Sequence, residues 1–118
     1  MRKLFLFILL ASLLTVAGCS SKASFETVSI EKAKELINEG KVTVIDVRSQ
    51  DEYNEGHIPG ATLIPLPELK DRTDELDKDT HYLIVCRSGN RSAQASEILV
   101  DNGFKHIYNL EKGMNEWK

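Results

Sequence analysis

The sequence has few cysteines, a single tryptophan and no long uninterrupted apolar run. Among its 118 residues the only cysteines are Cys19 and Cys86. The longest apolar stretch, Leu4 to Ala17, is shorter than the roughly 20 residues that a membrane-spanning helix needs. The sequence shows no internal repeat and no paired-ligand spacing typical of zinc sites. We therefore expect one small globular domain and neither a repeat protein nor a zinc-binding module.

The amino-terminal segment has the layout of a secretory signal. Arg2 and Lys3 precede the apolar stretch, and small residues follow it. The tetrapeptide Val-Ala-Gly-Cys at 16–19 resembles the lipobox of bacterial lipoproteins, with valine where leucine is usual. In that motif the cysteine becomes the first residue and carries the lipid, so we expect lipidation of Cys19. An uncleaved short membrane anchor is the alternative interpretation.

This interpretation divides the chain into three parts: a signal peptide at 1–18, a lipid-anchored tether at 19–27 and a folded domain at 28–118. The expected location is the cell envelope, on the extracytoplasmic side, either at an outer membrane or at the outer face of the cell membrane. The anchor makes the membrane a partner. Without Arg2 and Lys3 the net charge is near −5, and no basic patch suggests nucleic-acid binding.

Apolar runs alternate with helical patterns along the rest of the chain. Strands are predicted at 42–46, 61–64, 82–86 and 106–109. Helices are predicted at 29–39, 49–56, 66–76 and 92–102, with a helical turn at 113–117. Because the two strongest strands are apolar on both faces, we predict an α/β fold with a mainly parallel central sheet and helices on both faces.

The segment from Cys86 to Ser92 carries the clearest chemistry. It joins a buried strand to a helix start, where ligands bind in open α/β sheets. Its backbone N–H groups and the helix amino terminus would hold an anion and lower the pKa of the cysteine. We expect Cys86 to be an accessible, reactive thiolate, although an ordinary buried cysteine at a strand end is the simpler alternative. The candidate substrate-binding residues are Arg87, Ser88, Gly89, Asn90, Arg91 and Ser92.

These residues resemble the active-site loop of single-domain rhodaneses, which are thiosulfate sulfurtransferases. Three further segments resemble signatures of that family: 44–53 with its Asp-Val-Arg, 56–61 with Gly-His-Ile-Pro-Gly-Ala, and 102–117. Together they cover about residues 28–117. Lys112 departs from the family pattern, which usually has a second glycine there, and we expect a local backbone adjustment.

The resemblance implies a rhodanese-like domain that acts through a persulfide. Cys86 would take a sulfane sulfur from a donor anion such as thiosulfate and pass it to cyanide, a small thiol or the thiol of a partner protein. The resemblance implies neither a metal nor an organic cofactor. Asp46 and Arg48 are expected to organise the turn after a strand, and His57 to be a hydrogen-bonded turn residue. These three residues are predicted to give structural support.

Two other functions remain open from the residues themselves. Cysteine-dependent phosphatases and arsenate reductases use a similar loop with five residues between cysteine and arginine. Here four residues separate Cys86 from Arg91, which suits a sulfur atom better than a tetrahedral oxyanion. A non-enzymatic sulfur carrier or binding module on the same scaffold is the second alternative.

Overall fold

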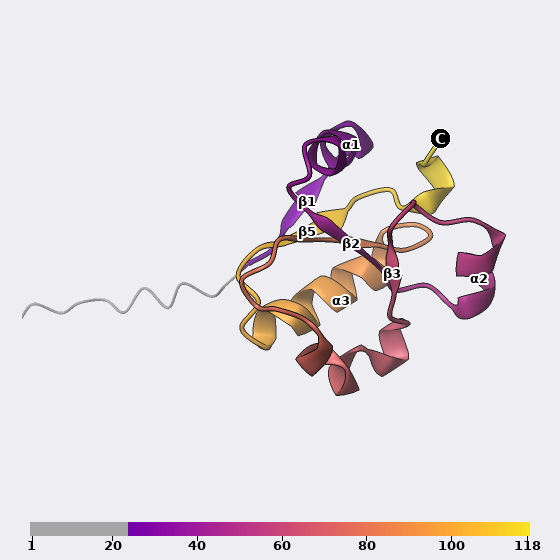
Figure 1. The fold of residues 1–118 in the computed structure, drawn as a ribbon. Helices are drawn as coiled ribbons and strands as arrows, with labels where there is room; N and C mark the ends of the chain where they lie inside the picture. Colours follow the sequence, from indigo (N-terminus) through magenta and orange to yellow (C-terminus); the bar gives the residue numbers. More distant parts are fainter. Residues whose placement is uncertain (1–23) are drawn as a thin grey trace, which may run out of the picture.

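The computed structural model describes residues 24–118, which build one central sheet. Its strands are β1 (Glu26–Val28), β2 (Thr43–Asp46), β3 (Thr62–Leu63), β4 (Tyr82–Val85) and β5 (Ile107–Leu110). They are arranged in the order β1-β5-β4-β2-β3, and every pairing is parallel (Figure 1). The predicted α/β fold is confirmed, and the described sheet is parallel throughout. All five strands therefore end at the same edge of the sheet.

Helices cover both faces of this sheet, as predicted. They are α1 (Ile30–Asn38), α2 (Gln50–Glu55) and α3 (Asn90–Asp101), with 3-10 helices at Leu66–Asp71, Thr73–Glu75 and Met114–Glu116. One apolar cluster joins the sheet to α3 and Leu69, and a second joins it to α1. Figure 1 shows α1 and α3 on opposite sides of the strands. Because both faces are buried, β4 is apolar at all four positions.

Local sequence signals account for two helix starts. The Ser29 side chain caps α1 by accepting a hydrogen bond from the Lys32 amide. At α2, Ser49 accepts from the amide of Glu52, and the Glu52 carboxylate accepts from the amide of Ser49. Both halves of this capping box are present, so two otherwise unpaired amides at the helix start are satisfied. The capping box also fixes the backbone at Glu52, a residue that proves important in the site.

Several boundaries differ from the sequence prediction. Residues 26–28, of which the first two were assigned to the tether, form an edge strand in which Glu26 pairs with Tyr108. A strand of three residues is too short to show the alternation of apolar and polar side chains that identifies strands in a sequence. The predicted helix at 66–76 is instead two 3-10 segments, because its backbone amides donate to carbonyls three residues back, as Glu68 does to Pro65 and Arg72 does to Leu69. Helix α3 begins at Asn90, two residues early, because Gly89 takes the cap position.

The expected signal peptide and the lipidated Cys19 lie outside the described residues. Within residues 24–118, no helix is both long enough and apolar enough to cross a membrane. The predicted division at 1–18 and 19–27 therefore stays a prediction.

Candidate active site

Cys86 directly follows β4, the central strand, at the edge where all the strands end. Its side chain continues the alternation of β4 toward α3 and joins the apolar cluster that contains Ile84 and Ala95. Cys86 is only 1% exposed, so the prediction of an accessible thiolate is wrong for this conformation. The loop after β4 folds back over the sulfur, with the Gly89 amide against Sγ.

The loop surrounds the Cys86 sulfur with hydrogen-bond donors. The Gly89 amide donates to Sγ over 3.0 Å, and the hydroxyl of Ser92 lies 3.2 Å from it. Burial raises the pKa of the Cys86 thiol, but hydrogen bonds from the Ser92 side chain and the amides of Ser92, Gly89 and Ser88 outweigh burial and lower the pKa overall. These donors lie at the amino terminus of α3, where the helix dipole also favours negative charge. The predicted lowering of the Cys86 pKa is therefore confirmed.

Gly89 is required by the shape of this loop. Its φ of 100° is in the left-handed region, which favours glycine. A Cβ atom placed there would lie 2.0 Å from the carbonyl oxygen of Glu111. The loop therefore packs backbone against backbone on the segment that follows β5, and any side chain at 89 would push the two apart.

The carboxy-terminal turn holds the loop from the other side. The Met114 amide donates to the Cys86 carbonyl over 2.7 Å, and the Asn115 amide donates to the Arg87 carbonyl over 2.9 Å. A Cβ at Gly113, where φ is 66°, would lie 2.5 Å from the Arg87 backbone. No non-glycine residue between 24 and 118 has a positive φ, so Lys112 keeps an ordinary backbone and the left-handed turn falls on Gly113.

Both arginines of the loop bind one carboxylate, that of Glu52 at the start of α2. Arg91 donates from both terminal nitrogens to the two carboxylate oxygens, over 2.8 and 2.9 Å. Arg87 donates from Nε to Oε2, also over 2.9 Å. The hydrogen bonds from Arg91 lower the pKa of Glu52 strongly, against the effect of burial, and those from Arg87 and Ser49 lower it further. Glu52 is therefore a carboxylate throughout the physiological pH range.

Sequence reasoning did not assign Glu52 to the site. The sequence prediction included the residue only within the helix at 49–56 and within the family-like segment at 44–53. The two arginines predicted an anionic substrate, and no local pattern indicates that a carboxylate 35 and 39 residues earlier pairs with them. Two other expected substrate-binding residues, Ser88 in the loop and Asn90 at the first position of α3, are exposed, and the Asn90 side chain accepts a hydrogen bond from Gln94 over 3.4 Å.

The residues expected to give structural support form a buried turn next to the loop. Arg48 binds both oxygens of Asp46, at distances down to 2.6 Å, and also donates to the Gly56 carbonyl. Asp46 is fully buried and Arg48 is 6% exposed. His57 lies within the same turn, where Nδ1 is 2.9 Å from the Tyr53 carbonyl and the two rings stack at 3.7 Å. These contacts tie β2 to the turn that follows α2.

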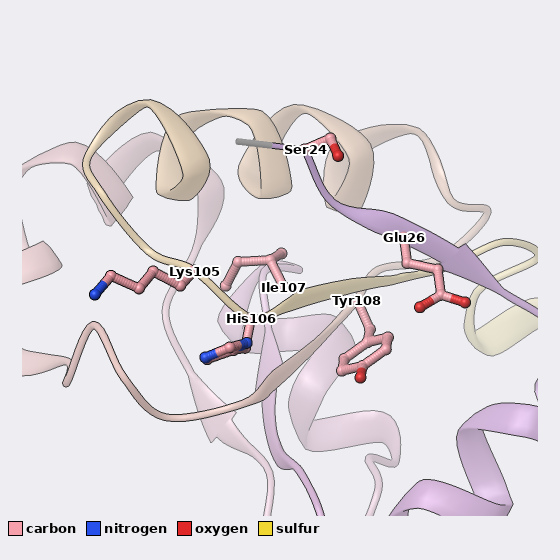
Figure 2. Close-up of a pocket in the computed structure, with 6 residues that line it drawn as sticks. All are labelled: Ser24, Glu26, Lys105, His106, Ile107 and Tyr108. Carbon is pink, nitrogen blue, oxygen red and sulfur yellow. The ribbon is translucent and has the colours of Figure 1, made fainter. Parts of the chain in front are cut away.

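The opposite edge of the sheet has a different character. Here the imidazole rings of His81 and His106, at the starts of β4 and β5, stack with centroids 4.0 Å apart. Figure 2 shows the shallow pocket beside His106, where the chain enters β1 near Ser24 and Glu26.

Within the described part of the chain, no three His, Cys, Asp or Glu side chains gather as they would around a metal ion. Trp117 is half-buried beside α1, with Lys34 Nζ 5.1 Å from its ring.

Comparisons with known proteins agree with this fold and loop. Residues 29–118 match the family model described as the rhodanese-like domain. The putative sulfur carrier protein YrkF of Bacillus subtilis is 35% identical over 80% of this chain, which spans 52% of YrkF. The thiosulfate sulfurtransferase GlpE of Coxiella burnetii is 33% identical over 80% of this chain and 88% of GlpE.

Solved structures give the same result. The crystal structure of a rhodanese-like domain protein from Staphylococcus aureus superposes with a TM-score of 0.74 and 36% identity, over 80% of this chain and 92% of that one. The human single-domain sulfurtransferase TSTD1 superposes with a TM-score of 0.71 and 27% identity, over 77% of this chain and 93% of that one. With its five-stranded parallel sheet and the Cys86 loop at the sheet's carboxyl edge, the chain belongs to the rhodanese-like domain family.

Proposed function

We propose that this protein is a sulfurtransferase that carries a sulfane sulfur on Cys86. The observation that supports the proposal is the environment of the sulfur: a thiol of lowered pKa at the amino terminus of α3, surrounded by loop amides, with Arg87 and Arg91 beside it. A thiolate is the nucleophilic form of cysteine, and the arginines attract an anionic donor. The names of GlpE and YrkF support the same chemistry.

The reaction balances without a cofactor. The Cys86 thiolate attacks the outer sulfur of thiosulfate, the S–S bond of the donor breaks, and sulfite leaves with the electron pair. The outer sulfur of the resulting persulfide takes the negative charge and accepts hydrogen bonds from the loop amides. Cyanide or a thiolate then attacks that outer sulfur and regenerates the Cys86 thiolate. Such a two-step covalent route has ping-pong kinetics.

A sulfur carrier is the second candidate function. Its support is the likeness to YrkF, a putative sulfur carrier protein that is 35% identical over 80% of this chain. Phosphatase chemistry has less support, since only four residues separate Cys86 from Arg91 and the loop closes tightly around the sulfur.

Turnover and loading together test the function. Full-length protein in detergent should convert thiosulfate and cyanide to thiocyanate, and Cys86→Ser should abolish this activity, while aryl phosphates should be hydrolysed far more slowly. Intact mass after thiosulfate treatment and desalting should show one added sulfur that persists until dithiothreitol or cyanide is added. Loading without turnover would support the carrier instead. Phosphatase turnover without sulfur transfer would contradict both.

We also propose that the protein is lipid-anchored through Cys19 at the extracytoplasmic side of a membrane. The lipobox-like residues 16–19 support this location. The parallel sheet adds a consequence: β1 enters the domain at the edge opposite Cys86, so an anchor before β1 would turn the loop away from the membrane. Fatty-acid labelling of the full-length protein should be lost in Cys19→Ala. An unlabelled, detergent-independent wild type would contradict the anchor.

A further inference from the structure

Three charged side chains contact one another beside the Cys86 loop: those of Arg87, Arg91 and Glu52. We call this group the mouth of the loop, and it holds two positive charges and one negative charge. Arg91 and Arg87 come from the loop and α3, and Glu52 comes from α2, 35 residues before Arg87 in the chain. The second acid in the neighbourhood, Asp46, is already paired with Arg48. The charged groups of the mouth are therefore Arg87, Arg91 and the Glu52 carboxylate, with a net charge of +1, and Arg91 is close enough to Cys86 for the two charges to interact.

The hydrogen bonds of the two arginines are not equivalent. Arg91 commits both terminal nitrogens to Glu52, and its side chain is about one-third exposed. Arg87 commits only Nε, and with 54% of its side chain exposed it presents its terminal nitrogens to solvent. Glu52 thus fixes both terminal nitrogens of Arg91. It holds Arg87 only through Nε, so the terminal nitrogens of Arg87 stay available for an incoming anion.

We propose that Glu52 is a positioning residue that sets the charge of this anion-binding mouth, so that the donor anion binds and the released anion also leaves. This inference rests on the proposed sulfur transfer. Two unopposed arginines would hold the donor more tightly and would equally hold the leaving sulfite, which inhibits the next turnover. The Glu52 carboxylate offsets one charge and keeps the mouth from retaining its product.

Glu52→Gln removes the charge and keeps a side chain of the same size that still accepts a hydrogen bond. We expect the thiosulfate KM and the sulfite inhibition constant to fall by about threefold to tenfold, as one added charge a few ångströms from an anion predicts at protein-surface dielectric. We expect kcat to fall as well, because product release slows. A reading independent of turnover is the pH dependence of Cys86 alkylation by iodoacetamide, whose midpoint should move to lower pH.

Two matched variants separate charge from helix capping. Ser49→Ala removes the cap partner of Glu52 and keeps the carboxylate, so sulfite inhibition should stay at the wild-type level. Glu55→Gln removes an acid from the exposed end of the same helix and should change neither constant. If Ser49→Ala reproduces the effects of Glu52→Gln, the cap is responsible and the inference is wrong.

Arg87→Gln tests the same charge by removing a positive group instead of a negative one. It also provides a test if Glu52→Gln does not fold. Arg87 is exposed, and its loss should weaken sulfite inhibition and move the alkylation midpoint to higher pH. Weaker sulfite binding in Glu52→Gln, or an unchanged midpoint in Arg87→Gln, would overturn the inference. The alkylation experiment, on full-length protein carrying Cys19→Ala, needs no donor. It therefore still decides the charge question if the wild type transfers no sulfur.

Discussion

The two edges of the parallel sheet carry polar groups in very different states. At the carboxyl edge, Asp46 and Arg48 are buried together and Glu52 binds two arginines. At the amino edge, Lys105 and Asp79 form an ion pair 3.6 Å long with most of both side chains exposed. Both edges contain charged residues and one close aromatic stack each. Within residues 24–118, the buried charged residues lie at the carboxyl edge, where each is held by several hydrogen bonds.

This difference shows that the charged side chains are held rigidly at the carboxyl edge, next to Cys86, and loosely at the amino edge. Exposed ion pairs are screened by water and contribute little to stability, whereas a buried charge requires a partner in good geometry. Fixed charges and amides around Cys86 need no rearrangement when an anion arrives, which is the condition for efficient electrostatic stabilisation. Matched substitutions at the two edges should therefore have unequal consequences.

The largest difference is expected between Asp46→Asn and Asp79→Asn. The first substitution leaves the buried Arg48 guanidinium without the negative charge of its partner, and breaking a buried pair in this way costs about 3–5 kcal/mol. The second removes one member of an exposed pair and should leave the free energy of unfolding unchanged within error. Urea unfolding followed by circular dichroism measures both. Equal losses would show that the two edges are energetically alike.

Glycines at the two edges provide the next comparison. Gly89→Ala forces a Cβ against the Glu111 carbonyl at 2.0 Å in a left-handed backbone, and we expect a loss of about 3 kcal/mol together with most of the sulfur-transfer activity. Gly103→Ala, also at positive φ, meets only the Lys78 side chain at 3.6 Å, so we expect a loss of about 1 kcal/mol. Full activity in Gly89→Ala would mean that the loop moves without harm to the site.

Arginine substitutions should separate binding from stability within the carboxyl edge itself. Arg91→Ala breaks two charged hydrogen bonds to Glu52, each worth about 1.5–3 kcal/mol, and should lower both kcat and the free energy of unfolding. Arg87→Ala breaks one such bond at an exposed position and should mainly raise the thiosulfate KM, by roughly tenfold. Lys105→Ala at the amino edge is the control and should match the wild type. Wild-type kinetics in both arginine variants would show that the backbone amides alone bind the anion.

How much of this could be predicted from sequence follows from the range of the interactions. Local signals predicted the apolar β4, the helix beginning near Ser49 and the turn around Asp46, because each depends on residues close together in the chain. The edge strand β1 was missed, since three residues show no period. The ion pair of Arg91 with Glu52 joins residues 39 positions apart, and the backbone of the Cys86 loop is held by amides from the carboxy-terminal turn. Neither leaves a local pattern.

The smallest expected effect concerns the ionisation of Cys86. With Cys19→Ala, Cys86 is the only thiol, and its alkylation by iodoacetamide should follow a pH midpoint below the ordinary thiol value of about 8.5. His106→Gln, at the amino edge, should leave the midpoint where it is. A midpoint at or above about 8.5 would mean that burial outweighs the donors from Ser88, Gly89 and Ser92.

The same shift makes a stability prediction with a definite sign. Because folding lowers the pKa of Cys86, the unfolded chain binds more protons than the folded one at pH values between the two pKa values. The contribution of Cys86 ionisation to stability is therefore fully present above the unfolded pKa of about 8.5 and is lost as the pH falls through the folded pKa. The difference in unfolding free energy between the Cys19→Ala protein and its Cys86→Ser derivative should rise with pH across that window. A difference that falls with pH would show that the thiol, and not the thiolate, is the form that the loop prefers.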